Sequence, residues 1–234
     1  MEKRMTKDVS YVFVPEVYVI ESATIKDYTQ KLQEGKALCE CLNIMGIPNF
    51  YFQVFTKSGF EYVLKQVAPS HCVKKDEENN IEEFTIPIIH ISAHGARDCF
   101  ALTNNSTISW KELKSFLAPV NAKCNECLIL CMSVCKGFMA YKAAETLRSS
   151  EVPFFQLIGP KEDISWKDSL LGFHIFYNRF DLLCNDKSDE LKNIMNCSIS
   201  KDIFEIIDGE SVQTKYHEKI VRVVHDLLSS RIKR

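Results

Sequence analysis

Two apolar runs constrain the fold of this chain more than any other feature. Residues 84–92 (FTIPIIHIS) are nearly all apolar, as expected of a strand that is buried on both faces of a parallel sheet. Residues 127–134 (CLILCMSV) predict a second core strand. Segments with helical periodicity lie between these and further apolar runs. Strands that alternate with helices predict the α/β class, with a mostly parallel central sheet and helices on both of its faces.

The alternation extends along most of the chain. Besides the two core strands, we expect strands at 11–20, 49–56 and 153–158, and helices at 25–44, 59–68, 110–117, 137–148, 166–184 and 215–230. Residues 99–109 predict a hairpin, and the acidic run 76–83 predicts a solvated loop. The sequence has no internal repeat, low-complexity segment or flexible linker, so we expect one domain over residues 1–234.

Composition excludes several classes of function. A net charge of −2 provides no overall field to hold nucleic acid or an anionic membrane. No stretch approaches the roughly 18 apolar residues of a membrane span, and Pro15 interrupts the first apolar run too early for a signal peptide. Ten cysteines in 234 residues are too few for a disulfide scaffold. We therefore expect a cytoplasmic protein with reduced thiols.

The residues that follow the two core strands have the chemistry of a nucleophilic site. His94 and Gly95 follow the first strand, and Cys135 follows the second. In a parallel sheet these strand ends meet at one edge, where a thiol beside an imidazole forms a nucleophile and its proton acceptor. Gly95 offers a backbone N–H for an oxyanion hole, and the helix that starts at Gly137 directs its positive end at Cys135. Lys136 adds a nearby cation.

Four segments of the chain resemble the caspase-like cysteine peptidases. His-Gly after one apolar strand and SVCKG (133–137) after another are similar to the caspase pattern, in which a histidine lies about 50 residues before Q-A-C-[RQG]-G; here the separation is 41. The intervening ALTNNSTISWKELKSFL resembles the CHAT-domain branch of that superfamily, and so does the downstream SWKDSLLGFHIFYNRF. The likeness covers about residues 84–180.

This resemblance implies a caspase-like three-layer sandwich and a cysteine endopeptidase that needs no metal or other cofactor. It makes Cys135 the nucleophile, His94 the general base and acid, and the N–H groups of Gly95 and Cys135 the oxyanion donors. No third member of a triad is evident, so we predict a dyad. Ser133 departs from the Gln of caspases and the Asp of metacaspase-like relatives, so their specificities do not carry over. Ser133 and Asp163 are the candidate substrate-binding residues, with a helix start as the other interpretation of Asp163.

The same residues support other interpretations. Cys124, Cys127, Cys131 and Cys135 have a spacing that resembles zinc or iron–sulfur sites, but an extended strand would spread them over more than about 20 Å. Cys131 is the fallback nucleophile, although it lies in the middle of a strand. His90 is either a second functional imidazole or, more often in such positions, a core histidine bonded to backbone. A catalytically silent caspase-like scaffold that binds a partner protein is the alternative function.

Partners and regulation follow from the resemblance alone. We expect a protein substrate, and regulation by an activating partner protein or by proteolysis, in a prokaryotic defence or programmed-death pathway. Residues 74–83 and 185–202 are the candidate loops for self-processing. The C-terminal helix carries an apolar stripe that is typical of a core-docking face, and basic residues that would suit an acidic partner. The stripe consists of Ile220, Val223, Val224, Leu227 and Leu228.

Overall fold

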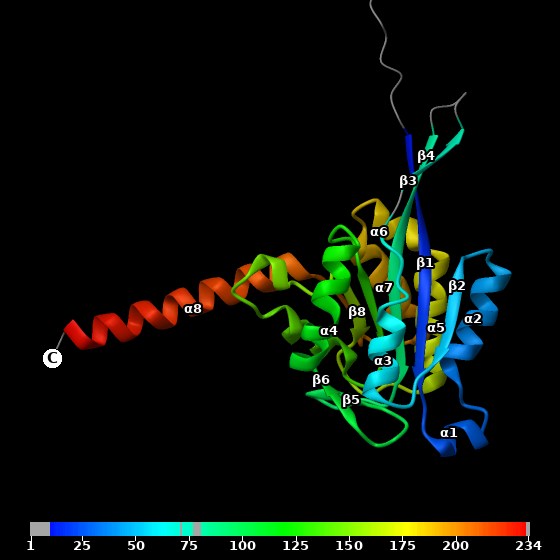
Figure 1. Cartoon of the computed structure of the whole chain (residues 1–234), viewed down its shortest axis with the longest axis horizontal. Coiled ribbons are helices and arrows are strands. Elements are labelled where there is room, and N and C mark those ends of the chain that lie inside the picture. Colours follow the sequence, from blue (N-terminus) through cyan, green and yellow to red (C-terminus); the bar gives the residue numbers. More distant parts are fainter. Residues whose placement is uncertain (1–9, 71, 77–80, 233–234) are drawn as a thin grey trace, which may run out of the picture.

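Strands β1 (Ser10–Ser22) and β4 (Ile81–Ala93) form the centre of the sheet in the computed structural model, which describes residues 10–70, 72–76 and 81–232 (Figure 1). The two strands pair in parallel over their full length, from Ser10 opposite Ile81 to Ser22 opposite Ala93. Both are rich in valine, isoleucine and aromatic residues, which favour the extended backbone because their side chains pack well on a pleated surface.

The sheet is mostly parallel, as the sequence predicts. Its main path runs in the order β2-β1-β4-β7-β8-β9, and β2, β1, β4, β7 and β8 are parallel to one another. The last strand, β9, is antiparallel to β8, and β3 pairs antiparallel with the start of β4. A separate hairpin consists of β5 and β6. The remaining strand bounds are Asn49–Gln53 (β2), Cys72–Asp76 (β3), Cys99–Ala101 (β5), Thr107–Ser109 (β6), Ile129–Ser133 (β7), Gln156–Pro160 (β8) and Phe204–Asp208 (β9).

Helices cover both faces of the sheet, which gives three layers (Figure 1). Alternate residues of β1 show why: Val19 packs into the core on one face, and Tyr18 and Ile20 pack into the core on the other. The first face is covered by α2 (Glu34–Ile44), α5 (Trp166–Asn178), α6 (Phe180–Cys184) and α7 (Ser188–Ile199). The second is covered by α3 (Lys57–Leu64), α4 (Trp110–Lys123) and the 3-10 helix η1 (Gly137–Ala144).

Several expected helices differ from the observed ones. The helix expected at 25–44 is two helices, α1 (Ile25–Thr29) and α2, because Lys31 has a positive φ of 58° and breaks the helical path. The helix expected at 166–184 likewise divides into α5 and α6. The segment expected as a helix from Gly137 to Arg148 is a shorter 3-10 helix, η1, and a second 3-10 turn, η2, spans Ser149–Glu151.

The structure also corrects the segments that we expected to be loops for self-processing. Residues 185–202, which we expected to be a loop, contain helix α7. Within the acidic run 76–83, Asp76 ends β3 and Ile81 begins β4, so its ends belong to strands rather than to a solvated loop. Residues 77–80 lie outside the described residues.

The C-terminal helix α8 (Gly209–Ile232) projects from the body for much of its length (Figure 1). Its first turns pack against the body, where Val212 is 5% exposed. Farther along, Val221 is 68% and Val223 is 48% exposed. The expectation that the stripe from Ile220 to Leu228 docks on the core is therefore wrong at Val223. The side chains of Val224, Leu227 and Leu228 lie outside those that the structure describes. None of the helices in the described residues has the length and hydropathy that a membrane span requires.

Candidate active site

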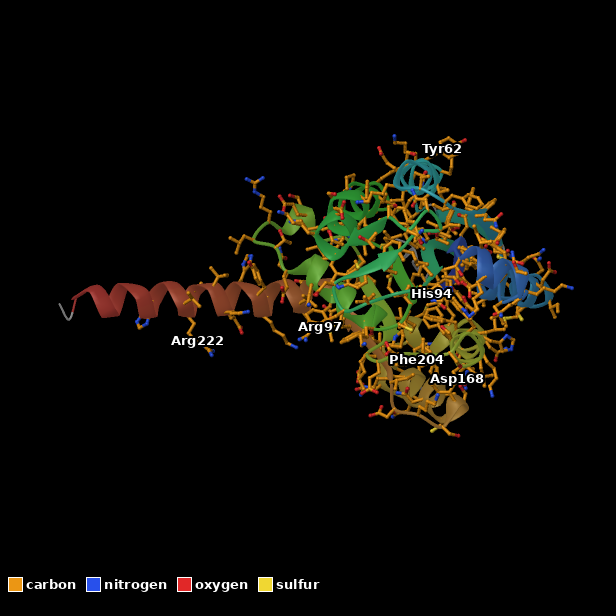
Figure 2. All side chains as sticks on the ribbon, turned by 90° about the horizontal axis from the view of Figure 1, so that it is seen from below. Tyr62, His94, Arg97, Asp168, Phe204 and Arg222 are labelled. Carbon is orange, nitrogen blue, oxygen red and sulfur yellow. The ribbon has the colours of Figure 1, made fainter. Side chains whose placement is uncertain are left out.

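Three neighbouring strands direct chain segments to the same edge of the sheet, which Figure 2 views from below with His94 on the body of the molecule. Strands β4 and β7 pair in parallel with Ser92 opposite Ser133. Two residues beyond this pair, His94 and Cys135 leave the sheet in matching positions. The expected meeting of the two strand ends is thus confirmed by the strand register.

The third neighbouring strand, β1, adds a carboxylate that the sequence analysis missed. Asp27 lies in α1, directly after β1, and its Oδ2 is 2.7 Å from Nε2 of His94. Thr24 caps the helix, and its backbone N–H donates to the same carboxylate oxygen at 2.8 Å. The Asp27 side chain is 8% exposed, whereas that of His94 is 45% exposed. A buried carboxylate therefore holds one ring nitrogen of a half-exposed histidine.

The surroundings of Asp27 favour its ionised form. Burial on its own raises the pKa of this carboxyl, but hydrogen bonds from Thr24 and His94 outweigh burial and lower the pKa below the usual 3.8. An ionised Asp27 orients the imidazole so that Nε2 faces the carboxylate and Nδ1 is the nitrogen left for other partners. The signal in the sequence was a capping box, Thr24 to Asp27, located just after the first strand.

A second missed residue is Trp166, the first residue of α5. Its ring lies edge-on to the His94 ring, with the centroids 5.1 Å apart at an angle of 68°. Ser165 caps α5 by accepting the N–H of Asp168, which fixes the start of the helix and hence the position of the indole. The His94 ring therefore contacts both Trp166 and Asp27.

The thiol of Cys135 faces the backbone of Ile164. Its Sγ is 3.5 Å from both the N and the O of Ile164, and in the described part of the chain it makes no hydrogen bond with His94. The neighbouring Lys136 has a positive φ of 57°, and its N–H donates to the carbonyl of Glu162 at 2.9 Å. The cysteine thus lies on a sharp turn that is attached to the loop after β8.

Two backbone N–H groups, those of Gly95 and Cys135, belong to segments that pack against each other at this turn. Gly95 packs against the turn so closely that a Cβ added to it would overlap Val134 and lie 2.5 Å from the carbonyl O and 3.2 Å from the N of Cys135. Among the described residues, the N–H groups of Gly95 and Cys135 donate to no acceptor, although those of Lys136 and Gly137 both do. Backbone N–H groups without an acceptor are candidates for an oxyanion hole.

The two candidate substrate-binding residues have different surroundings. Ser133 is 1% exposed, and its Oγ is 2.7 Å from Oγ of Ser169 in α5, so its environment does not favour contact with a substrate. Asp163 is 71% exposed and forms an ion pair of 3.1 Å with Lys136. Its role in substrate binding stays a prediction.

Gly137 has a packing role that we had not expected. A Cβ at this position would lie 2.7 Å from both Cβ and O of Met132, so the glycine allows η1 to pack on strand β7. The N-terminus of η1 still follows Cys135 by two residues, but it begins a 3-10 helix instead of an α-helix.

The side-chain positions do not support Cys131 as the nucleophile or the cysteines as a metal site. Cys131 is 0% exposed in β7, and burial raises the pKa of its thiol well above the usual 9. No group of three histidine, cysteine, aspartate or glutamate side chains in the described residues converges to hold a metal ion. The cysteines whose side chains the structure describes are all free thiols: Cys39, Cys41, Cys99, Cys124, Cys127, Cys131, Cys135, Cys184 and Cys197.

His90 lies below the site in a buried polar group. It is 0% exposed, its Nδ1 is 3.1 Å from the Tyr177 hydroxyl, and its Nε2 is 3.7 Å from Oε2 of the buried Glu34. We had expected a core histidine bonded to backbone. It is a core histidine whose partners are the side chains of Tyr177 and Glu34.

Comparison with known proteins adds no family to this description. No family model matches the chain, and no curated protein matches it at a significant level.

Proposed function

We propose that this chain is a caspase-like cysteine endopeptidase in which Asp27, His94 and Cys135 act together. The observation that carries the proposal is the meeting of three consecutive strands, β1, β4 and β7, whose ends bear a carboxylate, an imidazole and a thiol in that order. The proposal extends the expected dyad to a triad, and the distance of 2.7 Å between Asp27 Oδ2 and His94 Nε2 supports this extension.

The proposed reaction begins when His94 accepts the thiol proton of Cys135. The thiolate attacks the carbonyl carbon of the scissile peptide bond, and the N–H groups of Gly95 and Cys135 stabilise the negative charge on the carbonyl oxygen. His94 then gives its proton to the leaving amine as the C–N bond breaks. A water molecule, deprotonated by His94, hydrolyses the thioester and releases the acid and the free thiol. Asp27 stabilises the protonated imidazole in both halves of the cycle.

In the proposed reaction the Cys135 sulfur has to move towards His94. This requirement favours control of the activity by a partner or by processing. The Cys135 sulfur lies against the Ile164 backbone and not against His94. A substrate or an activating protein that shifts residues 162–166 would free the sulfur for the imidazole, and catalytic hydrogen bonds often tighten only when substrate is bound. We propose an activating partner protein for this step, in a defence or programmed-death pathway.

The second candidate function is a silent scaffold of the same fold. The contact between Cys135 and Ile164 favours it as well, because a thiol that stays there cannot attack a peptide bond. In the described part of the chain, five cavities of about 180–570 Å³ lie away from His94 and Cys135, for example between α3 and α4 or beside the start of α8.

The test is a set of acyloxymethyl-ketone probes that vary in the residue before the warhead. For a peptidase, we expect covalent labelling that maps to Cys135, disappears in Cys135→Ala and weakens in His94→Ala. Cys197→Ala is the matched control, because Cys197 is an exposed thiol far from the site in sequence and should not affect specific labelling. If folded protein carries no label on Cys135 with any probe, with or without candidate activators, the scaffold is the better account.

A further inference from the structure

A cavity of about 570 Å³ lies at the edge of the sheet opposite to the candidate active site. This edge is the one where β1 and β4 begin, beside α6, whereas α1 lies at the other end of the sheet (Figure 1). In the described part of the chain, no lysine or arginine lines the cavity, but four acidic residues do. These are Glu126, Asp186, Asp208 and Glu210.

The start of helix α8 accounts for only two of these carboxylates. Asp208 accepts a backbone N–H of the first turn of α8 at 2.6 Å, and Glu210 lies in that turn, where negative charge is favoured. Glu126 comes from the turn between α4 and β7, and Asp186 comes from the turn between α6 and α7. The negative charge of the cavity is thus assembled from three separate parts of the chain.

Two amide side chains in the same lining lack hydrogen-bond partners. Gln213 is 8% exposed, and its Nε2 has no acceptor. Oε1 of Gln156 is also buried, and it has no donor. A buried polar group without a partner costs free energy, which a ligand can recover. Because one amide lacks an acceptor and the other lacks a donor, a matching ligand offers both a carbonyl oxygen and N–H groups.

The spread of the carboxylates favours an extended cation over a metal ion. No group of three histidine, cysteine, aspartate or glutamate side chains in the described residues converges to hold one metal ion. The cations of the ligand should therefore be separated from one another. A linear polyamine meets this condition but offers only donors. A peptide with lysine or arginine side chains also offers backbone carbonyl oxygens.

An apolar pocket of about 240 Å³ adjoins the acidic cavity. The two share Phe155, Gln156 and Asp186 in their linings. Phe155 is 52% exposed, and Phe13, in the apolar pocket, is 42% exposed. Exposed aromatic side chains around a hollow are typical of a binding surface. The other apolar members of this lining include Phe84, Ile86, Ile129, Phe180 and Leu183.

We propose that the acidic cavity and the apolar pocket together bind a segment of a partner protein in which basic side chains flank one bulky apolar side chain. The basic side chains pair with the carboxylates, and a backbone carbonyl of the segment accepts from Gln213. The apolar side chain fills the pocket beside Phe155. Complementary charge and shape of this kind determine which partner is bound.

Fluorescence anisotropy with a short labelled peptide, in which arginines flank one leucine, tests the proposal. Removal of two charges by Glu126→Gln with Asp186→Asn should raise the dissociation constant about three- to tenfold, as expected for solvent-exposed ion pairs. The matched control is Glu40→Gln with Glu190→Gln, which removes the same charge from exposed residues that line neither hollow. Equal effects of the two double variants overturn the proposal.

Three further measurements separate a peptide site from a simple acidic surface. Replacement of the peptide's leucine by glycine should weaken binding, and so should Gln213→Leu, with thermal unfolding as the check that this variant folds. Spermine should compete only weakly. If the glycine peptide binds as well as the leucine peptide, or if spermine binds as tightly, the proposal is refuted. Binding should be unchanged in Cys135→Ala, so this result is independent of the test for peptidase activity.

Discussion

Replacement of Asp27 by asparagine tests whether Asp27 acts with His94 and Cys135 as a triad, or whether His94 and Cys135 act alone as a dyad. The carboxylate oxygen is 2.7 Å from Nε2 of His94, and its side chain is 8% exposed, so solvent screens this contact poorly. A hydrogen bond that involves a charged group contributes about 1.5–3 kcal/mol. Since about 1.4 kcal/mol is a factor of ten in rate, Asp27→Asn should slow the reaction of Cys135 by about 10- to 100-fold.

The assay is the rate constant for labelling of Cys135 by the best ketone probe, followed by mass spectrometry. Asp98→Asn is the matched control, because Asp98 is 76% exposed, pairs with Lys142 at 2.9 Å and lies on the segment that follows His94. Thermal unfolding of both variants separates loss of activity from loss of the α1 cap. Labelling of Asp27→Asn at the unmodified rate would show that the carboxylate does not act on His94 and would refute the triad.

The remaining predictions concern the oxyanion donors, a surface ion pair and the buried thiol. Gly95→Ala should abolish probe labelling, because its Cβ would lie 2.5 Å from the Cys135 carbonyl, and circular dichroism should show that the fold persists. A hydrogen bond from Lys57 is the main cause that lowers the pKa of Glu112 from 4.5 to about 2. The stability that ionised Glu112 contributes is therefore complete above pH 4.5 and is lost as the pH falls towards 2. The difference in urea midpoint between the unmodified chain and Glu112→Gln should therefore shrink over that range, and a constant difference would contradict this assignment. Cys131 is 0% exposed with a raised pKa, so iodoacetamide should not modify it in the folded protein, and Cys131→Ala should keep the labelling of Cys135.

Local sequence patterns were sufficient for the centre of the sheet. The run at 84–92 is apolar at nearly every position, which is typical of a strand that is buried on both faces. Because parallel neighbours end at the same edge, the residues after the two core strands could be brought together without coordinates. The strand register, with Ser92 opposite Ser133, agrees with that inference.

Other features depended on which distant segments pack together. Asp27 has the sequence signature of a helix start, and nothing local distinguishes it from Asp168, which also begins a helix. Its contact with His94 exists because β1 lies beside β4, which is a pairing between residues far apart in the chain. Trp166 reaches the same imidazole because β8 follows β7 in the sheet.

For the apolar stripe of α8, too, the sequence determines one property and the tertiary structure decides another. Its spacing determined that residues 215–230 form a helix with one apolar face, and α8 confirms the helix. Whether that face meets the core depends on where β9 ends and in which direction the chain leaves the sheet. Hydrophobic periodicity specifies that a face must be covered, because burial of apolar area is favourable wherever it occurs. Only the tertiary structure decides which surface is within reach, because that depends on the direction and length of every element packed before it.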